Sequence, residues 1–215
     1  MKKIITAILG LAMALGASAQ VSFWDSGKPA EKVSFGVRAG MNISEINVDG
    51  TDTKFGFFGG LGTDFNIVNS FSINSGLFFT QKGGKMKMRM DVEQPVNAKL
   101  RMTVNFIEIP VYASYRLRFN DSHMSQIFFG PYFDFGVYGK ATAEVKAAGQ
   151  KESASEGLFN DENGFRRFQC GLGIGIAHTW NRFSVGLSFQ GGLTDVADDF
   201  DAEWNNFNVS IGYNF

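Results

Sequence analysis

Few side chains in this sequence could perform acid–base or nucleophilic chemistry. It contains two histidines and one cysteine, and histidine is the side chain whose charge changes near neutral pH. His123 falls in a short polar link and His178 near the end of an apolar segment, so both are expected to be ordinary residues at the rim of the fold. Cys170 shares the spacing of its apolar neighbours and is expected to fill space. The set is too small for a Cys/His zinc site. The sequence therefore predicts no enzyme and no cofactor.

Carboxylates gather near the C-terminus without an intervening basic residue, at Asp195, Asp198, Asp199, Asp201 and Glu203. Oxygen ligands at this density could hold Ca²⁺, but the spacing is not that of an EF-hand loop. We expect a solvated acidic loop. A calcium site at the four aspartates is the weaker alternative.

Basic and apolar side chains alternate between residues 85 and 104. The basic positions are Lys85, Lys87, Arg89, Lys99 and Arg101, and the apolar positions are Met86, Met88, Met90, Leu100, Met102 and Val104. Alternation with period two predicts a two-stranded ribbon with one basic and one apolar face. Methionine-rich faces adapt to varied ligands, so a lid or docking surface for an apolar partner is one hypothesis. The alternative is a hairpin that only packs on neighbouring loops.

Length and composition favour one ordered domain. The chain has 215 residues, of which 44% are hydrophobic and 14% aromatic, with 26 glycines. These values exclude a disordered or collagen-like chain. The 20 basic and 21 acidic residues nearly cancel, so no global positive field indicates a nucleic-acid partner.

The N-terminus has the pattern of an export signal. A positive start at residues 1–3 precedes an apolar stretch at 4–17 and a small-residue cleavage site at 17–19. The stretch is shorter than the roughly 20 residues that a spanning helix needs, so a membrane anchor is disfavoured. We expect residues 1–19 to be a cleaved signal peptide and residues 20–32 a periplasmic lead-in.

The remaining chain, residues 33–215, contains segments with large apolar residues at every second position. Eight such segments can be counted, at 33–43, 55–65, 71–79, 107–119, 127–137, 168–177, 183–190 and 207–215. Period two predicts strands with one apolar face. The apolar faces carry no Asp, Glu, Lys or Arg, and a basic residue at bilayer mid-depth would cost about 2–4 kcal/mol. The fold class expected is all-β, an eight-stranded antiparallel up-and-down transmembrane barrel; a soluble barrel with an apolar interior is the alternative.

The links between these segments alternate in length. Tight turns are expected at 67–70, 120–125 and 179–182, and long links at 44–54, 81–105, 139–164 and 191–206. This alternation is typical of outer-membrane barrels with periplasmic turns and extracellular loops. We expect both chain ends on the periplasmic side. Within the last but one of these long links, residues 140–163, which mix Ala, Ser, Lys and Glu, are expected to be a mobile loop.

Six charged residues fall on the polar face and should point into a narrow lumen, namely Arg38, Asp64, Glu108, Arg116, Arg118 and Asp134. Three charges of each sign suit a buried ion-pair network that fills the barrel. A gate or a proton path is the alternative. By strand parity the apolar face of the ribbon should turn toward the mouth and the basic face outward, toward anionic lipid head groups, provided that no bulge intervenes at residues 83–84.

Several motifs resemble those of one family of outer-membrane barrels. They are FGVRAGMN at 35–42, FTQKGG at 79–84, FIEIP at 106–110, GPY at 130–132 and the closing GYNF at 212–215. Together they resemble the PorT-like outer-membrane β-barrel family over nearly the whole mature chain. The resemblance implies an eight-stranded barrel and, through the family's name, a link to protein secretion.

We therefore predict a monomeric, non-enzymatic barrel of the outer membrane that serves as an envelope or secretion-associated scaffold. Its expected partners are outer-membrane lipid and a protein of a secretion or envelope assembly that meets the long loops. A carrier of a small apolar ligand at the barrel mouth is the alternative function.

Overall fold

The architecture comes from a computed structural model that describes residues 25–48, 50–90, 96–120, 122–147, 150–159, 165–197 and 202–215. The predicted signal peptide at residues 1–19 and the first part of the lead-in lie outside these ranges, so both remain predictions. Among the described residues, no helix is long and apolar enough to cross a membrane.

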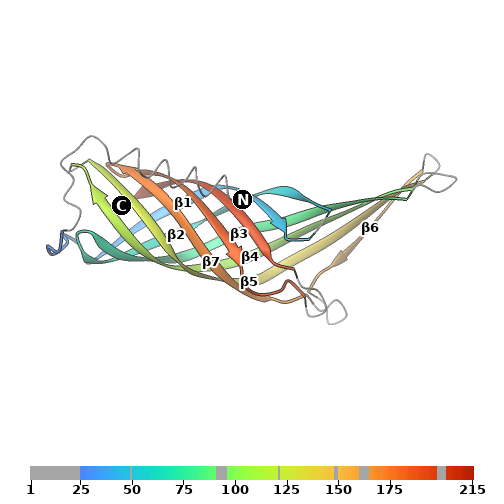
Figure 1. The fold of residues 1–215 in the computed structure, drawn as a ribbon, viewed down its shortest axis with the longest axis horizontal. Coiled ribbons are helices and arrows are strands. Elements are labelled where there is room, and N and C mark those ends of the chain that lie inside the picture. Colours follow the sequence, from blue (N-terminus) through green and yellow to red (C-terminus); the bar gives the residue numbers. More distant parts are fainter. Residues whose placement is uncertain are drawn as a thin grey trace.

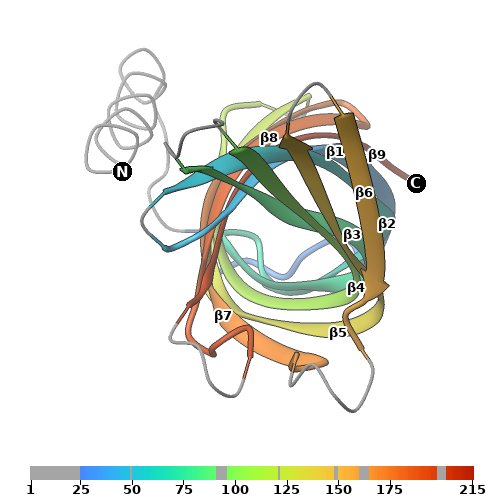
Figure 2. The same ribbon diagram turned by 90° about the vertical axis from the view of Figure 1, so that its right-hand side faces the viewer.

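Nine strands are formed, with the bounds β1 (Val33–Ile46), β2 (Thr51–Val68), β3 (Phe71–Met90), β4 (Val96–Arg118), β5 (His123–Ala147), β6 (Gln150–Gly157), β7 (Phe168–Trp180), β8 (Phe183–Gly192) and β9 (Trp204–Asn214). Eight of them close a ring, because each strand except β6 pairs with its chain neighbours in the ring and β9 pairs with β1. All pairings are antiparallel, and Figure 2 looks into the resulting barrel. The prediction of an eight-stranded up-and-down barrel is confirmed.

The alternating pattern sets which side chains face outward. In β1, Met41 is 62% exposed on the outer wall, whereas Asn42 beside it is 1% exposed inside. The register keeps this parity between strands, since Asn42 pairs with Asn208 of β9 and Met41 with Val209. A slip of one residue would exchange the two faces. The apolar outer wall and the polar interior therefore follow directly from the sequence pattern.

Strands β3, β4, β5 and β6 continue past the barrel as a projecting sheet, which we call the arm (Figure 1). In the arm, β3 pairs with β4 as far as Met90 and Val96, β4 with β5 as far as Asn97 and Lys146, and β5 with β6 up to Ala147 and Gln150. The ribbon expected at residues 85–104 is present as the paired ends of β3 and β4, but it is not limited to two strands, because β5 and β6 extend it to four. The expectation of a mobile loop at 140–163 is wrong for 140–147, the end of β5, and for 150–157, which form β6.

An apolar cluster closes the barrel on the side of the arm. Its buried members are Ile46, Val104, Phe106, Leu158, Val196, Ala202 and Trp204. They come from strands on opposite sides of the ring and from the segments after β6 and β8. Because Trp204 is 2% exposed and Phe106 fully buried, this mouth is filled by the chain's own side chains.

The opposite end of the barrel is held by tight turns and by the lead-in. The β2–β3 turn bonds to the lead-in, since Ser70 N donates to Asp25 O and Asn69 N to Gly27 O, at 3.1 and 3.0 Å. The C-terminus lies at this same end, far from the arm (Figure 1). The described end of the lead-in and the C-terminus thus share one side, as predicted.

Candidate functional site

The centre of the lumen is an ion cluster built on Lys82. Its Nζ lies 2.7 Å from Asp134 Oδ2 and 3.5 Å from Glu108 Oε2, and the side chain is completely buried. The same ammonium lies over the Tyr132 ring, 4.6 Å from its centroid. Strands β3, β4 and β5 each place one charge at this level, because all three positions have inward parity.

A hydrogen-bonded chain crosses the lumen from this cluster to the other side of the barrel. Gln190 Nε2 donates to Glu108 Oε1 at 2.8 Å and to Tyr112 Oη at 3.1 Å. Asn206 Nδ2 in turn donates to Gln190 Oε1 at 3.0 Å and to Asn208 Oδ1 at 2.9 Å. The chain links β4 through β8 to β9, so the polar interior ties opposite walls together.

The six lumen charges predicted from the sequence do not form one network. Arg38 Nη2 lies 3.3 Å from Asp64 Oδ1, while Glu108 and Asp134 belong to the Lys82 cluster. The remaining two, Arg116 and Arg118, form no ion pair with any residue that the structure describes. The sequence reasoning missed Lys82, although it has the same parity as the inward-facing Thr80 and Phe78.

Aromatic rings fill most of the lumen that the charges leave. Tyr112 and Phe128 stack with their ring centroids 5.3 Å apart. A cavity of about 70 Å³ lies in the lumen beside these rings, the volume of roughly two liquid water molecules. The interior is therefore a packed polar core rather than an aqueous channel.

The arm has two chemically different faces. On β4, Lys99 and Arg101 are exposed, whereas Met102 packs against the apolar cluster and Val104 is fully buried within it. The β3–β4 register runs without a shift from Phe78 to Met90, so no bulge changes the parity. For Lys87, Met88, Arg89 and Met90 the structure describes the backbone of β3 alone.

The basic face extends beyond the two strands expected to carry it. Arg101 pairs with Lys85 on β3 and with Thr142 on β5, and the next position on β5 with this parity is the exposed Lys140. Lys54 of β2 joins them, because its side chain lies over Gly83 and its Nζ donates to Thr103 Oγ1. Like charges in directly opposite positions, such as Lys85 and Arg101, repel each other. Lys85 is also directly opposite Asp52 of β2, and Lys99 is opposite Glu144 of β5, so carboxylates of the chain lie next to these cations.

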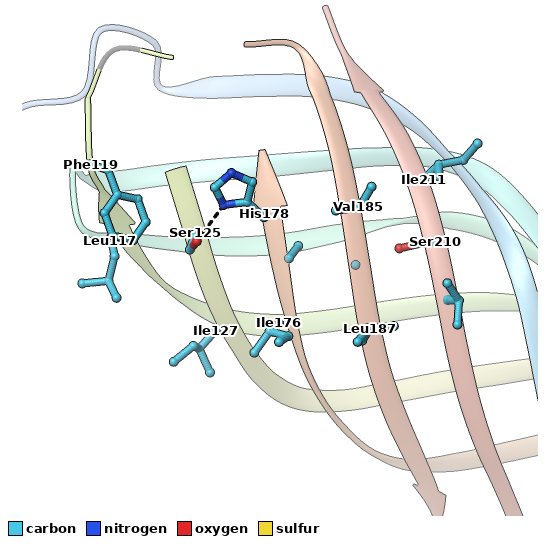
Figure 3. A pocket seen from close by; sticks show the side chains of 13 residues that line it. Leu117, Phe119, Ser125, Ile127, Ile176, His178, Val185, Leu187, Ser210 and Ile211 are labelled. Carbon is cyan, nitrogen blue, oxygen red and sulfur yellow. Dashed lines mark hydrogen bonds between the residues drawn. The ribbon is translucent and has the colours of Figure 1, made fainter. Parts of the chain in front are cut away.

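The two histidines meet on the outer wall near the turn end. Ser125 Oγ is 2.9 Å from His178 Nδ1, and His178 Nε2 is 3.2 Å from His123 Nδ1. Beside them is an apolar groove of about 340 Å³ (Figure 3), lined by Leu117, Ile127, Ile176, Val185, Leu187 and Ile211 among others. The residues on β5 and β7 here lie in continuous ladder register, with Ser125 opposite His178 and His123 opposite Trp180.

The acidic segment after β8 is described only in part. Asp195 and Glu203 are half-buried, while Val196 and Ala202 pack into the apolar cluster. Asp198, Asp199 and Asp201 lie outside the described residues. Among those described, no group of three His, Cys, Asp or Glu side chains could hold a metal ion.

Comparison with known proteins agrees with this geometry. A sequence model of the outer membrane protein beta-barrel domain matches residues 7–215. None of the curated protein sequences compared matches the chain.

Three similar solved structures are outer-membrane proteins. They are the attachment invasion locus protein Ail of Yersinia pestis (15% identity, 86% of this chain and 100% of that chain, TM-score 0.41), OprG of Pseudomonas aeruginosa (10%, 89% and 99%, 0.36) and the outer membrane enzyme PagL (12%, 83% and 98%, 0.33). At these identities the likeness concerns the fold alone.

Proposed function

Because the chain belongs to the outer membrane protein beta-barrel domain family, and is an outer-membrane protein, we propose that it is a non-enzymatic scaffold that displays the arm to a partner. The partner belongs to an envelope or secretion assembly, in keeping with the PorT-like motifs. The observation that carries the proposal is the combination of a closed barrel with a four-stranded projection. A barrel that is packed inside offers its surface, not its lumen, for function.

The two faces of the arm suit two different contacts. The basic face continues the lipid-facing wall of β3, since the positions after Phe79 with the same parity are Gln81, Gly83 and Lys85. The side chain of Lys54 lies over Gly83 on this face. Cations just beyond the hydrocarbon layer lie where anionic head groups are found. This face is therefore proposed to rest on the outer leaflet, and the opposite face is left for the protein partner.

The apolar face near the mouth is proposed to receive that partner. A recess of about 110 Å³ at the base of the arm is lined by Ile46, Val48, Met86, Leu100 and Met102, among others. Pockets for small ligands usually measure about 300–1,000 Å³, so the recess is too small for a carried ligand. A side chain of a partner protein fits its size, which is why the carrier function is not favoured.

The test compares two arm variants isolated from native outer membranes after mild cross-linking. The triple change Met86→Ser, Leu100→Ser and Met102→Ser removes the apolar face, and the control Lys85→Gln, Lys99→Gln and Arg101→Gln removes basic side chains from the other face of the same strands. We expect the first variant to lose the cross-linked protein that the wild type captures and the control to retain it. Equal capture by the wild type and the apolar-face variant would contradict the proposal.

A further inference from the structure

A second polar cavity lies at the turn end of the barrel, away from the arm. It measures about 220 Å³ and is lined by Asp25, Asn69, Ser70, Arg116, Arg118, Phe119 and Asn120. These residues come from the lead-in, the β2–β3 turn and the end of β4. The apolar cluster lies at the opposite mouth, so among the described residues this cavity opens at the end of the barrel that we expect to face the periplasm.

Two guanidinium groups enter the cavity from one face of β4. Arg116 and Arg118 are two residues apart, which places their Cα atoms about 6.6 Å apart with the same parity. Arg116 is 8% exposed. Its Nη1 donates to Asn66 Oδ1 at 2.7 Å and its Nη2 to Val68 O at 3.1 Å, both neutral acceptors. Its Nε is buried and has no partner among the described residues.

The nearest described carboxylates are already engaged by other groups. Asp25 accepts hydrogen bonds from Gly27 N at 2.8 Å and Asn69 Nδ2 at 3.0 Å. Asp64 accepts from Arg38 Nη2 at 3.3 Å and Asn74 Nδ2 at 2.6 Å. Neither lies within ion-pair distance of Arg116 or Arg118.

Burying a cation whose hydrogen-bond partners are all neutral is costly, because a carboxylate beyond ion-pair distance, such as Asp64 here, repays its lost hydration only in part. Two adjacent guanidinium groups also repel each other. Both costs fall when one oxyanion bridges the pair, and a guanidinium fork matches the geometry of carboxylate and phosphate oxygens. The cavity could hold about seven water volumes, enough for one such group and a small substituent.

We propose that this cavity binds a small oxyanionic group, a carboxylate or a phosphate, presented from the periplasm, with Arg116 and Arg118 as its two cationic anchors. The site is independent of the arm and adds a periplasmic contact to the scaffold. A peptide C-terminus would supply the carboxylate, and a phosphorylated head group or sugar would supply the phosphate.

The test is calorimetric titration of the full mature protein, in a neutral detergent, with inorganic phosphate and with N-acetylalanine as separate probes. We expect saturable one-to-one binding of at least one probe, weakened by added NaCl because the contact is ionic. Binding of phosphate alone would assign a phosphorylated source, and binding of N-acetylalanine alone a peptide terminus.

Three variants decide whether these arginines are responsible. Arg118→Gln changes an exposed side chain and should fold normally, and it is expected to weaken binding at least roughly tenfold. The double variant Arg116→Gln with Arg118→Gln should abolish binding, and Arg182→Gln on the same rim should leave it unchanged. Absence of saturable binding of either probe to the wild type, or equal binding by Arg118→Gln, would overturn the proposal.

Discussion

Lys82 is the residue on which the lumen depends most. It is the only described cation in contact with Glu108 and Asp134, and all three side chains are buried. Replacing Lys82 by Met keeps most of the volume but leaves two carboxylates without a counter-charge. Breaking a buried ion pair in this way costs about 3–5 kcal/mol.

The expected result for Lys82→Met is therefore a lower urea midpoint of the refolded barrel, measured from tryptophan fluorescence in lipid vesicles. Lys99→Met, which changes an exposed lysine of the arm, is the matched control and should unfold like the wild type. If both variants had the wild-type midpoint, the ion cluster would not contribute to stability.

Asp25 makes the docking of the lead-in dependent on pH. The backbone N–H of Gly27 and then the side-chain amide of Asn69 hold the pKa of Asp25 below its ordinary value of 3.8. Because the pKa of Asp25 is lower when the lead-in is docked, its carboxylate stabilises docking fully at pH values above the ordinary pKa. This stabilisation is lost as the pH falls through the lowered pKa. At neutral pH the carboxylate holds the lead-in.

Hydrogen–deuterium exchange over residues 25–32, corrected for the intrinsic pH dependence of exchange, measures this effect. We expect Asp25→Ala to exchange faster than the wild type at neutral pH and the difference to vanish below the lowered pKa. A difference that persists unchanged in acid would assign the effect to something other than the charge of Asp25.

For single residues, the sequence predicted which side chains point into the lumen, but not which ion pairs they form there. The inward positions of Arg38, Glu108 and Asp134 follow from period two alone. The choice of Lys82 as the counter-charge of Glu108 and Asp134 could not be made, because Lys82 lay in a segment interpreted as a loop. Arg118 was placed in the network by parity, yet it lies where the barrel ends and the lumen opens to solvent.

Among the elements, β7 shows why the barrel needs glycine inside. Three successive inward positions on β7 are Gly171, Gly173 and Gly175, and each faces an aromatic ring from β4 or β5. A Cβ at Gly173 would lie 2.6 Å from Tyr112 Oη. The ring fills the space that a side chain on β7 would otherwise need.

Gly173→Leu is therefore expected to destabilise the barrel by about 1–3 kcal/mol, the usual cost of overpacking a filled core. Urea unfolding in vesicles measures the loss, and Ile174→Leu, on the lipid-facing side of the same strand, serves as the control. A stable Gly173→Leu barrel would show that Tyr112 can move aside.

The eight barrel strands were predictable because each carries its own apolar stripe. The outer parts of β5 and β6 were not, since residues 150–157 are Gln, Lys, Glu, Ser, Ala and Gly with little intrinsic preference for strands. The outer part of β5 pairs with β4, and β6 forms a hairpin with β5, so their strand structure depends on these partners and not on an apolar stripe of their own.

For the whole molecule, closure is the property from which the proposed function follows. The apolar cluster fills one mouth, the Lys82 cluster and stacked rings fill the middle, and a cavity of about 70 Å³ lies beside the rings. Sequence reasoning anticipated a crowded lumen from the charges and glycines. It did not predict the apolar cluster that closes the mouth, because Val196 and Trp204 come from a link interpreted as a solvated acidic loop.

Single-channel recording of the purified mature protein in planar bilayers tests the closed scaffold most directly. We expect no conductance above that of the bare bilayer. The arm variants should also show no conductance, because the apolar cluster and the ion cluster lie within the barrel. Trp204→Ala and Phe106→Ala remove two large side chains from the apolar cluster, and the lumen should still be closed at the level of Lys82. Stable openings of the wild-type protein would contradict the account, since a conducting lumen would make the barrel a channel and not a scaffold.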